Sequence, residues 1–362
     1  MIVETLNEQM AKNIRYIKPA PIGGGRLAAQ LYEQIQTDFL PVPLLLLHTP
    51  MPELMAATWS ILRESLLASQ TGNRRARIRK EVVAATVSKT NECPFCVDAH
   101  TFMLHATAEH EAAGAILRGN YEAIRDPELQ ALAQWALANR TSHGDSLQAP
   151  PFSYHEAPEM VGTAVTFHYL NRMANVFLGD TLLPLPSAMK GVTGRLMAPS
   201  VGKRFVQPSL PQGKSLQFVP AANLPDDLAW ASTNPAVAGA FAGFAAVIEK
   251  VVEKAGAVLP ERVRALVWER VQAWHGEEMG MSRRWVDELV AEVEDEHRNA
   301  ARLALLTALA SYQVDSRTVE AFQTQYPDDR QLLAATAWAS FTAARRAGRW
   351  IAAPLVSSEG ER

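Results

Sequence analysis

Apolar residues recur every three to four positions along most of the 362-residue chain, which is the spacing of one face of a helix. Two-residue alternation, the mark of a half-buried strand, is nearly absent. The β-branched stretch 82–87 has strand propensity, but charged residues that favour helices flank it. The sequence therefore predicts an all-α fold. The expected helices span residues 51–69, 74–90, 127–140, 157–178, 235–254, 261–274, 282–293, 296–312 and 330–351.

The composition is that of an ordinary globular protein, with 48% hydrophobic and 20% charged residues. The formal net charge is −3 and no long block of one sign occurs, which argues against a nucleic-acid partner. The first residues carry acidic side chains and no apolar run, so we expect no secretory signal. The apolar stretch 40–48 contains two prolines and is shorter than the roughly 20 residues that cross a bilayer. We expect a cytoplasmic protein with no membrane partner.

A stretch rich in proline and glycine, residues 181–228, divides the chain. Proline removes backbone donors and glycine raises the conformational entropy of the chain, so this composition is typical of a linker or a wrapping arm. The sequence therefore predicts one helical domain at residues 1–180 and a second at 229–362.

The two halves resemble each other as diverged copies would. RIRKEVV at 77–83 aligns with RVRALVW at 262–268, and FHYLNRMANVF at 167–177 aligns with FTAARRAGRWI at 341–351. A period near 180 residues is too long for a solenoid repeat, so we predict duplication of a whole domain. The alternative is a likeness of composition between two helical halves.

The chain has only two cysteines, Cys93 and Cys96, which excludes a disulfide framework. If a helix begins near Asn91, a good N-cap residue, then Cys93, Cys96 and His100 project within about 60° of one another. Partial positive charge at the helix N-terminus favours thiolate, most of all at Cys93. His100 could exchange a proton near neutral pH, and Glu81 could reach the cluster from the preceding helix only by tertiary packing.

Three kinds of site are compatible with this cluster. A structural zinc ion needs a fourth ligand, but His105 would face another side and His110 would lie roughly 20 Å further along the helix axis. A pair of unreactive buried cysteines is the second possibility. We favour a redox dithiol, because Cys-x-x-Cys lets one sulfur close on the other without rearranging the backbone. We accordingly expect neither a bound metal nor a cofactor.

The tetrapeptide Cys-Pro-Phe-Cys is similar to a glutaredoxin active site, but the strand–helix–strand context of that family does not follow Cys96. The chain resembles more closely the alkyl hydroperoxidase D-like family of the carboxymuconolactone decarboxylase-like superfamily, over roughly residues 40–180. The signature of that family is a glutamate, eleven residues, Cys-x-x-Cys, three residues and a histidine. Its positions are matched here by Glu81, Cys93, Cys96 and His100.

The resemblance implies an all-helical thiol-dependent peroxidase that needs no bound cofactor. Cys96 would attack the hydroperoxide, and Cys93 would resolve the product and exchange with an external dithiol reductant. His100 and Glu81 would relay protons. The founding enzymes carry a histidine where Phe95 stands, which puts full peroxidase efficiency in doubt. The family commonly associates through helical faces, so we expect a homo-oligomer, either a dimer or a trimer.

The second half lacks this chemistry. When Leu266 is aligned with Glu81, the same spacings arrive at Glu278, Met281 and Trp285, none of which performs thiol chemistry. Among the remaining histidines, His168 is the exception that we consider as a further candidate site residue, because it lies on the closing helix of the first half. Two other functions stay open: a decarboxylase-like reaction on a small carboxylated or lactone substrate, and a non-catalytic redox-sensing scaffold.

Overall fold

The structure is a computed structural model that describes residues 11–21, 25–180, 210–256 and 258–357. Within these ranges the chain forms helices, turns and two isolated β-bridges, without a strand, which confirms the all-α prediction. The main helices are α2 (Arg26–Asp38), α3 (Pro43–Leu46), α4 (Pro52–Leu62), α5 (Arg74–Thr90), α6 (Pro94–Ala106), α7 (His110–Arg118), α8 (Pro127–Ala138), α9 (Ala157–Phe177), α11 (Pro235–Lys254), α12 (Glu261–Ala273), α13 (Arg284–Val290), α14 (Arg298–Leu309), α15 (Ser316–Gln325) and α16 (Asp329–Ser357).

Helix α5 shows why local sequence predicted many of these bounds. It begins after Asn73, whose side chain accepts a hydrogen bond from the backbone of Ala76, and it ends at Thr90 as expected. The β-branched stretch 82–87 lies inside it and is buried. Helices α2, α7 and α15 were not expected from the sequence.

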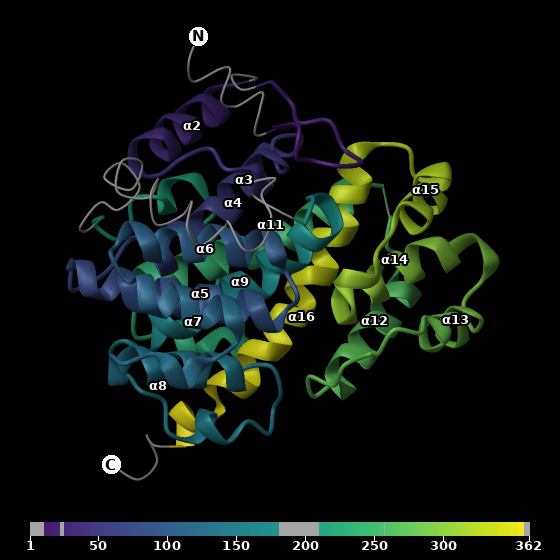
Figure 1. Cartoon of the computed structure of the whole chain (residues 1–362). Coiled ribbons are helices and arrows are strands. Elements are labelled where there is room, and N and C mark those ends of the chain that lie inside the picture. Colours follow the sequence, from purple (N-terminus) through teal and green to yellow (C-terminus); the bar gives the residue numbers. More distant parts are fainter. Residues whose placement is uncertain (1–10, 22–24, 181–209, 257, 358–362) are drawn as a thin grey trace.

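Helices α9 and α16 pack against each other at the centre of the molecule. Figure 1 shows α16 as the long yellow helix between the helices of the first half and α12–α14. A Cβ atom at Gly348 on α16 would lie 2.9 Å from Cγ2 of Val165 on α9, so the glycine permits this close approach. Helix α5 packs along α9, and α14 packs along α16. The duplication of a whole domain stays a prediction.

The described part of the segment 181–228 packs against a π-helical turn, η1 (Arg63–Leu67), that continues α4. Glu64 in this turn is fully buried and accepts hydrogen bonds from the backbone of Gly213 and from the backbone and hydroxyl of Ser215. Arg63 donates to the same carboxylate over 2.8 Å. A buried charge requires such partners, and these bonds hold Gly213 and Ser215 against the turn. The domain boundaries and the role of this segment as a linker or arm stay predictions. Residues 181–209 lie outside the described residues.

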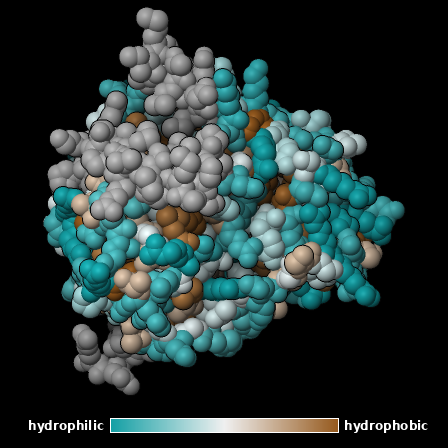
Figure 2. All heavy atoms as spheres, in the orientation of Figure 1, coloured by the Kyte–Doolittle hydropathy of each residue, from teal (hydrophilic) through white to brown (hydrophobic). Residues whose placement is uncertain are grey.

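Helix α11 is long and apolar enough to cross a membrane by length and composition, but 61% of its apolar window is buried inside the structure. Burial of this kind is typical of the core helix of a globular protein. The face in Figure 2 is mostly hydrophilic, with apolar residues in small separate areas. The cytoplasmic location stays a prediction.

A glycine on the contact between the two halves provides a test of the fold. Gly276 has φ +98°, and a Cβ atom there would lie 2.0 Å from the backbone oxygen of Arg140. Gly280 has φ +66°, and a Cβ atom there would meet nothing within 4 Å. We expect Gly280→Ala to lower the free energy of unfolding by about 1 kcal/mol, the cost of a left-handed backbone.

Gly276→Ala adds a backbone clash to this cost, so we expect a loss of about 3 kcal/mol or more. Urea unfolding of both variants measures the difference. Equal losses in the two variants would show that the contact between residues 140 and 276 is not formed in solution.

Candidate active site

The turn between α5 and α6 positions the first cysteine. The amide of Cys93 donates to the carbonyl of Ser88 over 3.0 Å and that of Glu92 to the carbonyl of Lys89 over 3.3 Å, while Glu92 has φ +52°. These two bonds and the left-handed residue form a Schellman motif, in which glycine is the usual residue at the position of Glu92.

The helix that carries the cysteines therefore begins later than expected. Asn91 is the C-cap of α5, and α6 begins at Pro94 with Cys93 as its N-cap. The prediction of a helix start near Asn91 was wrong because Pro94 favours the first helical position and keeps the preceding residue out of the helical conformation. Cys96 and His100 still lie one turn apart on α6.

The two thiols lie together in the interior. Cys93 and Cys96 are free cysteines with exposed fractions of 1% and 0%, and their Sγ atoms are 2.6 Å apart. A bonded pair of sulfurs is about 2.05 Å apart. The backbone therefore already places the two sulfurs where a small movement of the side chains would join them.

Burial raises the pKa of the Cys93 thiol well above its ordinary value, and the hydrogen bond and charge of Cys96 act in the same direction. The thiolate expected at Cys93 from its place near the helix N-terminus is therefore disfavoured. The helix N-terminus does favour the thiolate, but withdrawal of the sulfur from water disfavours it more strongly.

The carboxylate of Glu81 on α5 contacts both the ring of His100 and the guanidinium of Arg77. Its Oε2 lies 2.7 Å from Nδ1 of His100, and its Oε1 accepts from Nε of Arg77 over 2.7 Å. Burial alone would raise the pKa of this carboxyl, but the charge of Arg77 and the hydrogen bonds from Arg77 and His100 hold it below its ordinary value. Arg77 was not identified as part of the site from the sequence; its signal was the i, i+4 spacing from Glu81.

An ionised Glu81 only accepts hydrogen bonds, so Nδ1 of His100 is the donor in this contact. In the neutral imidazole the proton then sits on Nδ1, and Nε2 is free to accept one. The ring also meets the edge of Phe167 on α9, with centroids 4.3 Å apart at 85°. His100 is thus held in one tautomer and one orientation.

A polar network on α9 lies on the other side of the turn. Ser88 donates to Ala84 and accepts from Nδ2 of Asn171 over 3.0 Å. Asn171 Oδ1 accepts in turn from Nδ2 of Asn91 over 3.0 Å, and the same Asn91 nitrogen lies 3.1 Å from Nδ1 of His168. The sequence signal was a polar stripe along one face of an apolar helix, formed by His168, Asn171, Arg172 and Asn175.

Burial and this network determine the protonation and the tautomer of the His168 ring. Burial lowers its pKa well below the ordinary value, and the charge of Arg172 lowers it further, so the ring is neutral. Its Nδ1 accepts from Asn91, which leaves the proton on Nε2. Nε2 has no hydrogen-bond partner within the described ranges.

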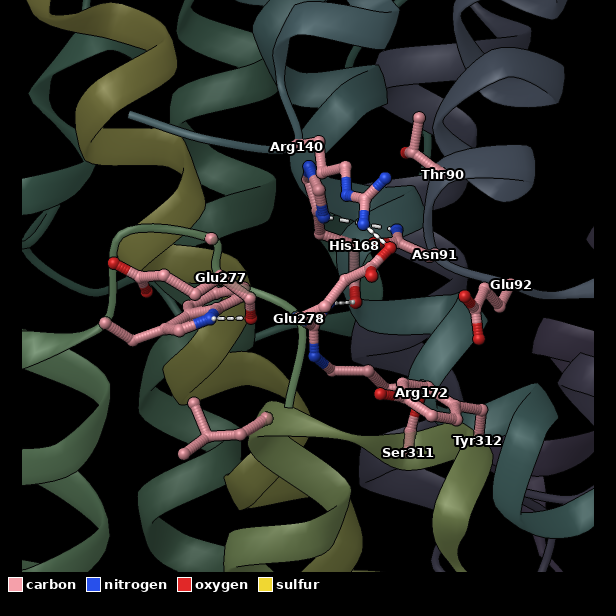
Figure 3. A pocket seen from close by; sticks show the side chains of 13 residues that line it. Thr90, Asn91, Glu92, Arg140, His168, Arg172, Glu277, Glu278, Ser311 and Tyr312 are labelled. Atoms are coloured by element: carbon pink, nitrogen blue, oxygen red, sulfur yellow. Dashed lines mark hydrogen bonds and ion pairs between the residues drawn. The ribbon is translucent and has the colours of Figure 1, made fainter. Parts of the chain in front are cut away.

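A small cavity of about 60 Å³ lies beside this network, between the two halves of the chain (Figure 3). Its lining combines the α5–α6 turn with loops of the second half. The residues that line it are Thr90, Asn91, Glu92, Arg140, His168, Arg172, Trp274, Gly276, Glu277, Glu278, Leu309, Ser311 and Tyr312.

The residues considered as further zinc ligands lie at the other end of α6. Nδ1 of His105 is 2.9 Å from Nδ1 of His110, and the two rings pack together. In the part of the chain that the structure describes, no group of three or more His, Cys, Asp or Glu side chains is arranged to hold a metal ion.

The residues of the second half that align with Glu81, Cys93, Cys96 and His100 do not form a cluster. Glu278 forms an ion pair with Arg140 at the cavity, Met281 is 99% exposed, and Trp285 lies on α13. Leu266, aligned with Glu81, lies on α12. These positions form no counterpart of the dithiol.

A named relative matches almost the whole chain. The chain is 39% identical over 357 residues to a protein of Mycobacterium tuberculosis named alkyl hydroperoxide reductase Rv2159c, and the match covers 97% of each chain. The chain belongs to the same family as this alkyl hydroperoxide reductase. This relative confirms the kinship with alkyl hydroperoxide reductases that the motif predicted. Membership of the wider superfamily stays a prediction. No family model matches the chain, and no solved structure matches it.

The raised pKa of Cys93 can be measured. In a Cys96→Ser variant, we expect the rate of Cys93 alkylation by iodoacetamide to rise steadily through pH 9 without reaching a plateau. The thiolate is the reactive form, and burial, the largest cause of the raised pKa, remains in this variant. Mass spectrometry across pH 6–10, with free cysteine as the control, follows the reaction. A plateau at or below pH 7 would contradict the direction of the shift.

Proposed function

We propose that this protein reduces hydroperoxides with the Cys93 and Cys96 thiols and is recharged by an external dithiol. The observation that carries the proposal is the pair of sulfurs 2.6 Å apart, one helical turn from a histidine that a buried carboxylate orients. The relative named alkyl hydroperoxide reductase, similar over almost the whole chain, supports the same reaction.

Cys96 is the attacking thiol in this proposal. Nε2 of His100 takes the proton of the Cys96 thiol, and the thiolate attacks the outer oxygen of the hydroperoxide. A sulfur–oxygen bond forms while the oxygen–oxygen bond breaks, so that Cys96 becomes a sulfenic acid. The departing alkoxide takes the proton back from His100 and leaves as an alcohol. Glu81 holds the imidazole and stabilises its charged form.

Cys93 then resolves the sulfenic acid. Its sulfur attacks that of Cys96, a disulfide forms, and the hydroxyl leaves as water with the proton of Cys93. An external dithiol restores both thiols by two exchange steps and becomes a disulfide itself. The raised pKa of Cys93 supports this division of roles, because the protonated thiol is the weaker nucleophile toward peroxide.

Variants of the two cysteines separate these roles. We expect Cys93→Ser to stop turnover but still form a dimedone-trapped sulfenic acid at Cys96 after one equivalent of peroxide. We expect Cys96→Ser to give neither turnover nor an adduct at Cys93. In the unaltered protein, mild peroxide should remove two hydrogens and protect both thiols from alkylation. An adduct at Cys93 alone would reverse the assignment.

The same assay tests the proton relay. His100→Phe should lower the rate by about 10²- to 10⁴-fold while the helical circular dichroism is unchanged. Glu81→Gln should lower the rate less, because the carboxylate acts through His100. Met281→Ala is the control, since this side chain is 99% exposed and aligned with Cys96 in the second half. Full activity in a folded His100→Phe variant would remove the histidine from the mechanism.

We also propose that the protein is a homo-oligomer, a dimer or a trimer, from the habit of the family that the motif resembles. Light scattering at micromolar concentration should give a multiple of the 39.7 kDa chain mass. A single species at the mass of one chain would contradict this.

A further inference from the structure

Arg172 is a buried cation without an anionic partner. Its Nε donates to the carbonyl of Ala308 over 2.8 Å, its Nη1 donates to that of His168 over 2.7 Å, and the guanidinium lies 5.6 Å from the ring centre of Trp274. Burial lowers its pKa to about 10. Among the described residues no carboxylate forms an ion pair with it. Burying an arginine is costly unless an anion compensates the charge.

His168 adds a second donor to the same cavity. The chain of hydrogen bonds from Ser88 through Asn171 and Asn91 leaves the proton of the neutral ring on Nε2, which has no partner in the described structure. An unpaired buried donor is rare in a folded protein. Two unsatisfied features in one cavity, a cation and an N–H donor, both favour an anion.

The acidic residues of the cavity are exposed to solvent, whereas its two basic residues on α9 are not. Glu92, Glu277 and Glu278 are exposed, and Arg172 and His168 are buried. The carboxylate of Glu278 is paired with Arg140, and that of Glu277 accepts from the backbone of His275 over 2.8 Å. The inner wall therefore presents donors and positive charge.

We propose that this cavity is a binding site for the carboxylate of a small organic acid, held by Arg172 and His168. Its volume of about 60 Å³ leaves room for a small polar head group. Asn91 and Glu92, which line the cavity, directly precede Cys93 in the chain, so a bound acid would lie beside the segment that carries the first thiol. The acid is a thiol reductant or a hydroperoxide, and this last point rests on the proposed function.

Calorimetric titration tests the site apart from redox chemistry when the protein carries both Cys93→Ser and Cys96→Ser. Propionate is the probe, and propionamide, of the same shape without charge, is its control. We expect saturable one-to-one binding of propionate and none of propionamide. Arg172→Met should weaken propionate about 10- to 100-fold, because a charge-assisted hydrogen bond is lost.

Arg346→Met is the matched control. Arg346 donates to the carbonyl of Trp274 over 3.0 Å but does not line the cavity, so we expect unchanged affinity. Absence of saturable propionate binding to the otherwise unaltered chain would overturn the proposal without relying on the folding of any arginine variant. Equal losses in the two arginine variants, or equal binding of inorganic phosphate, would overturn it as well.

Kinetics of the enzyme with both cysteines distinguish the two sources of the carboxylate. If the acid is the reductant, Arg172→Met raises the KM for 3-mercaptopropionate but not that for 2-mercaptoethanol. If it is the substrate, the variant raises the KM for a carboxylated hydroperoxide but not that for tert-butyl hydroperoxide. Propionate binding in a chain without peroxidase turnover would refute the proposed function and leave the site standing.

Discussion

The buried carboxylate of Glu81 is the interaction on which the candidate site depends. It lies in the interior between α5 and α6, where an ionised carboxyl is stable only with partners on both oxygens. Arg77 holds one oxygen and the ring of His100 the other. This arrangement joins the two helices, sets the tautomer of the histidine and directs its second nitrogen away from the carboxylate. The same contact therefore serves packing and chemistry.

Burial of the dithiol opposes its reactivity, and the proposed mechanism accounts for this. Withdrawal from water keeps Cys93 protonated despite its place at a helix N-terminus. A protonated thiol resists indiscriminate oxidation, which follows thiolate character and exposure. A neighbouring base is then required to produce the attacking thiolate, and His100 lies one helical turn beyond Cys96 to supply it.

The second half contributes to the site although it carries no thiol. Its helix α16 packs on α9 (Figure 1), and residues of the second half line the cavity beside the α5–α6 turn. The carbonyl of Ala308, near the end of α14, accepts from Arg172, and Trp274 lies against the guanidinium. The second half thereby holds a cation in place next to the chain segment that leads to Cys93.

The sequence by itself determined the all-α fold, the bounds of α5 and the four residues of the motif. These follow from local causes: a helical period of apolar residues, an asparagine cap and fixed spacings along the chain. Only the tertiary structure decided that Arg77 pairs with Glu81, that Arg172 and His168 share a cavity, and that the pKa of Cys93 is raised. Those outcomes depend on how far each group is withdrawn from water and on which residues, distant in the chain, surround it. Tertiary packing determines the desolvation and the neighbours of a group, and the spacing of residues along one segment does not encode either of them.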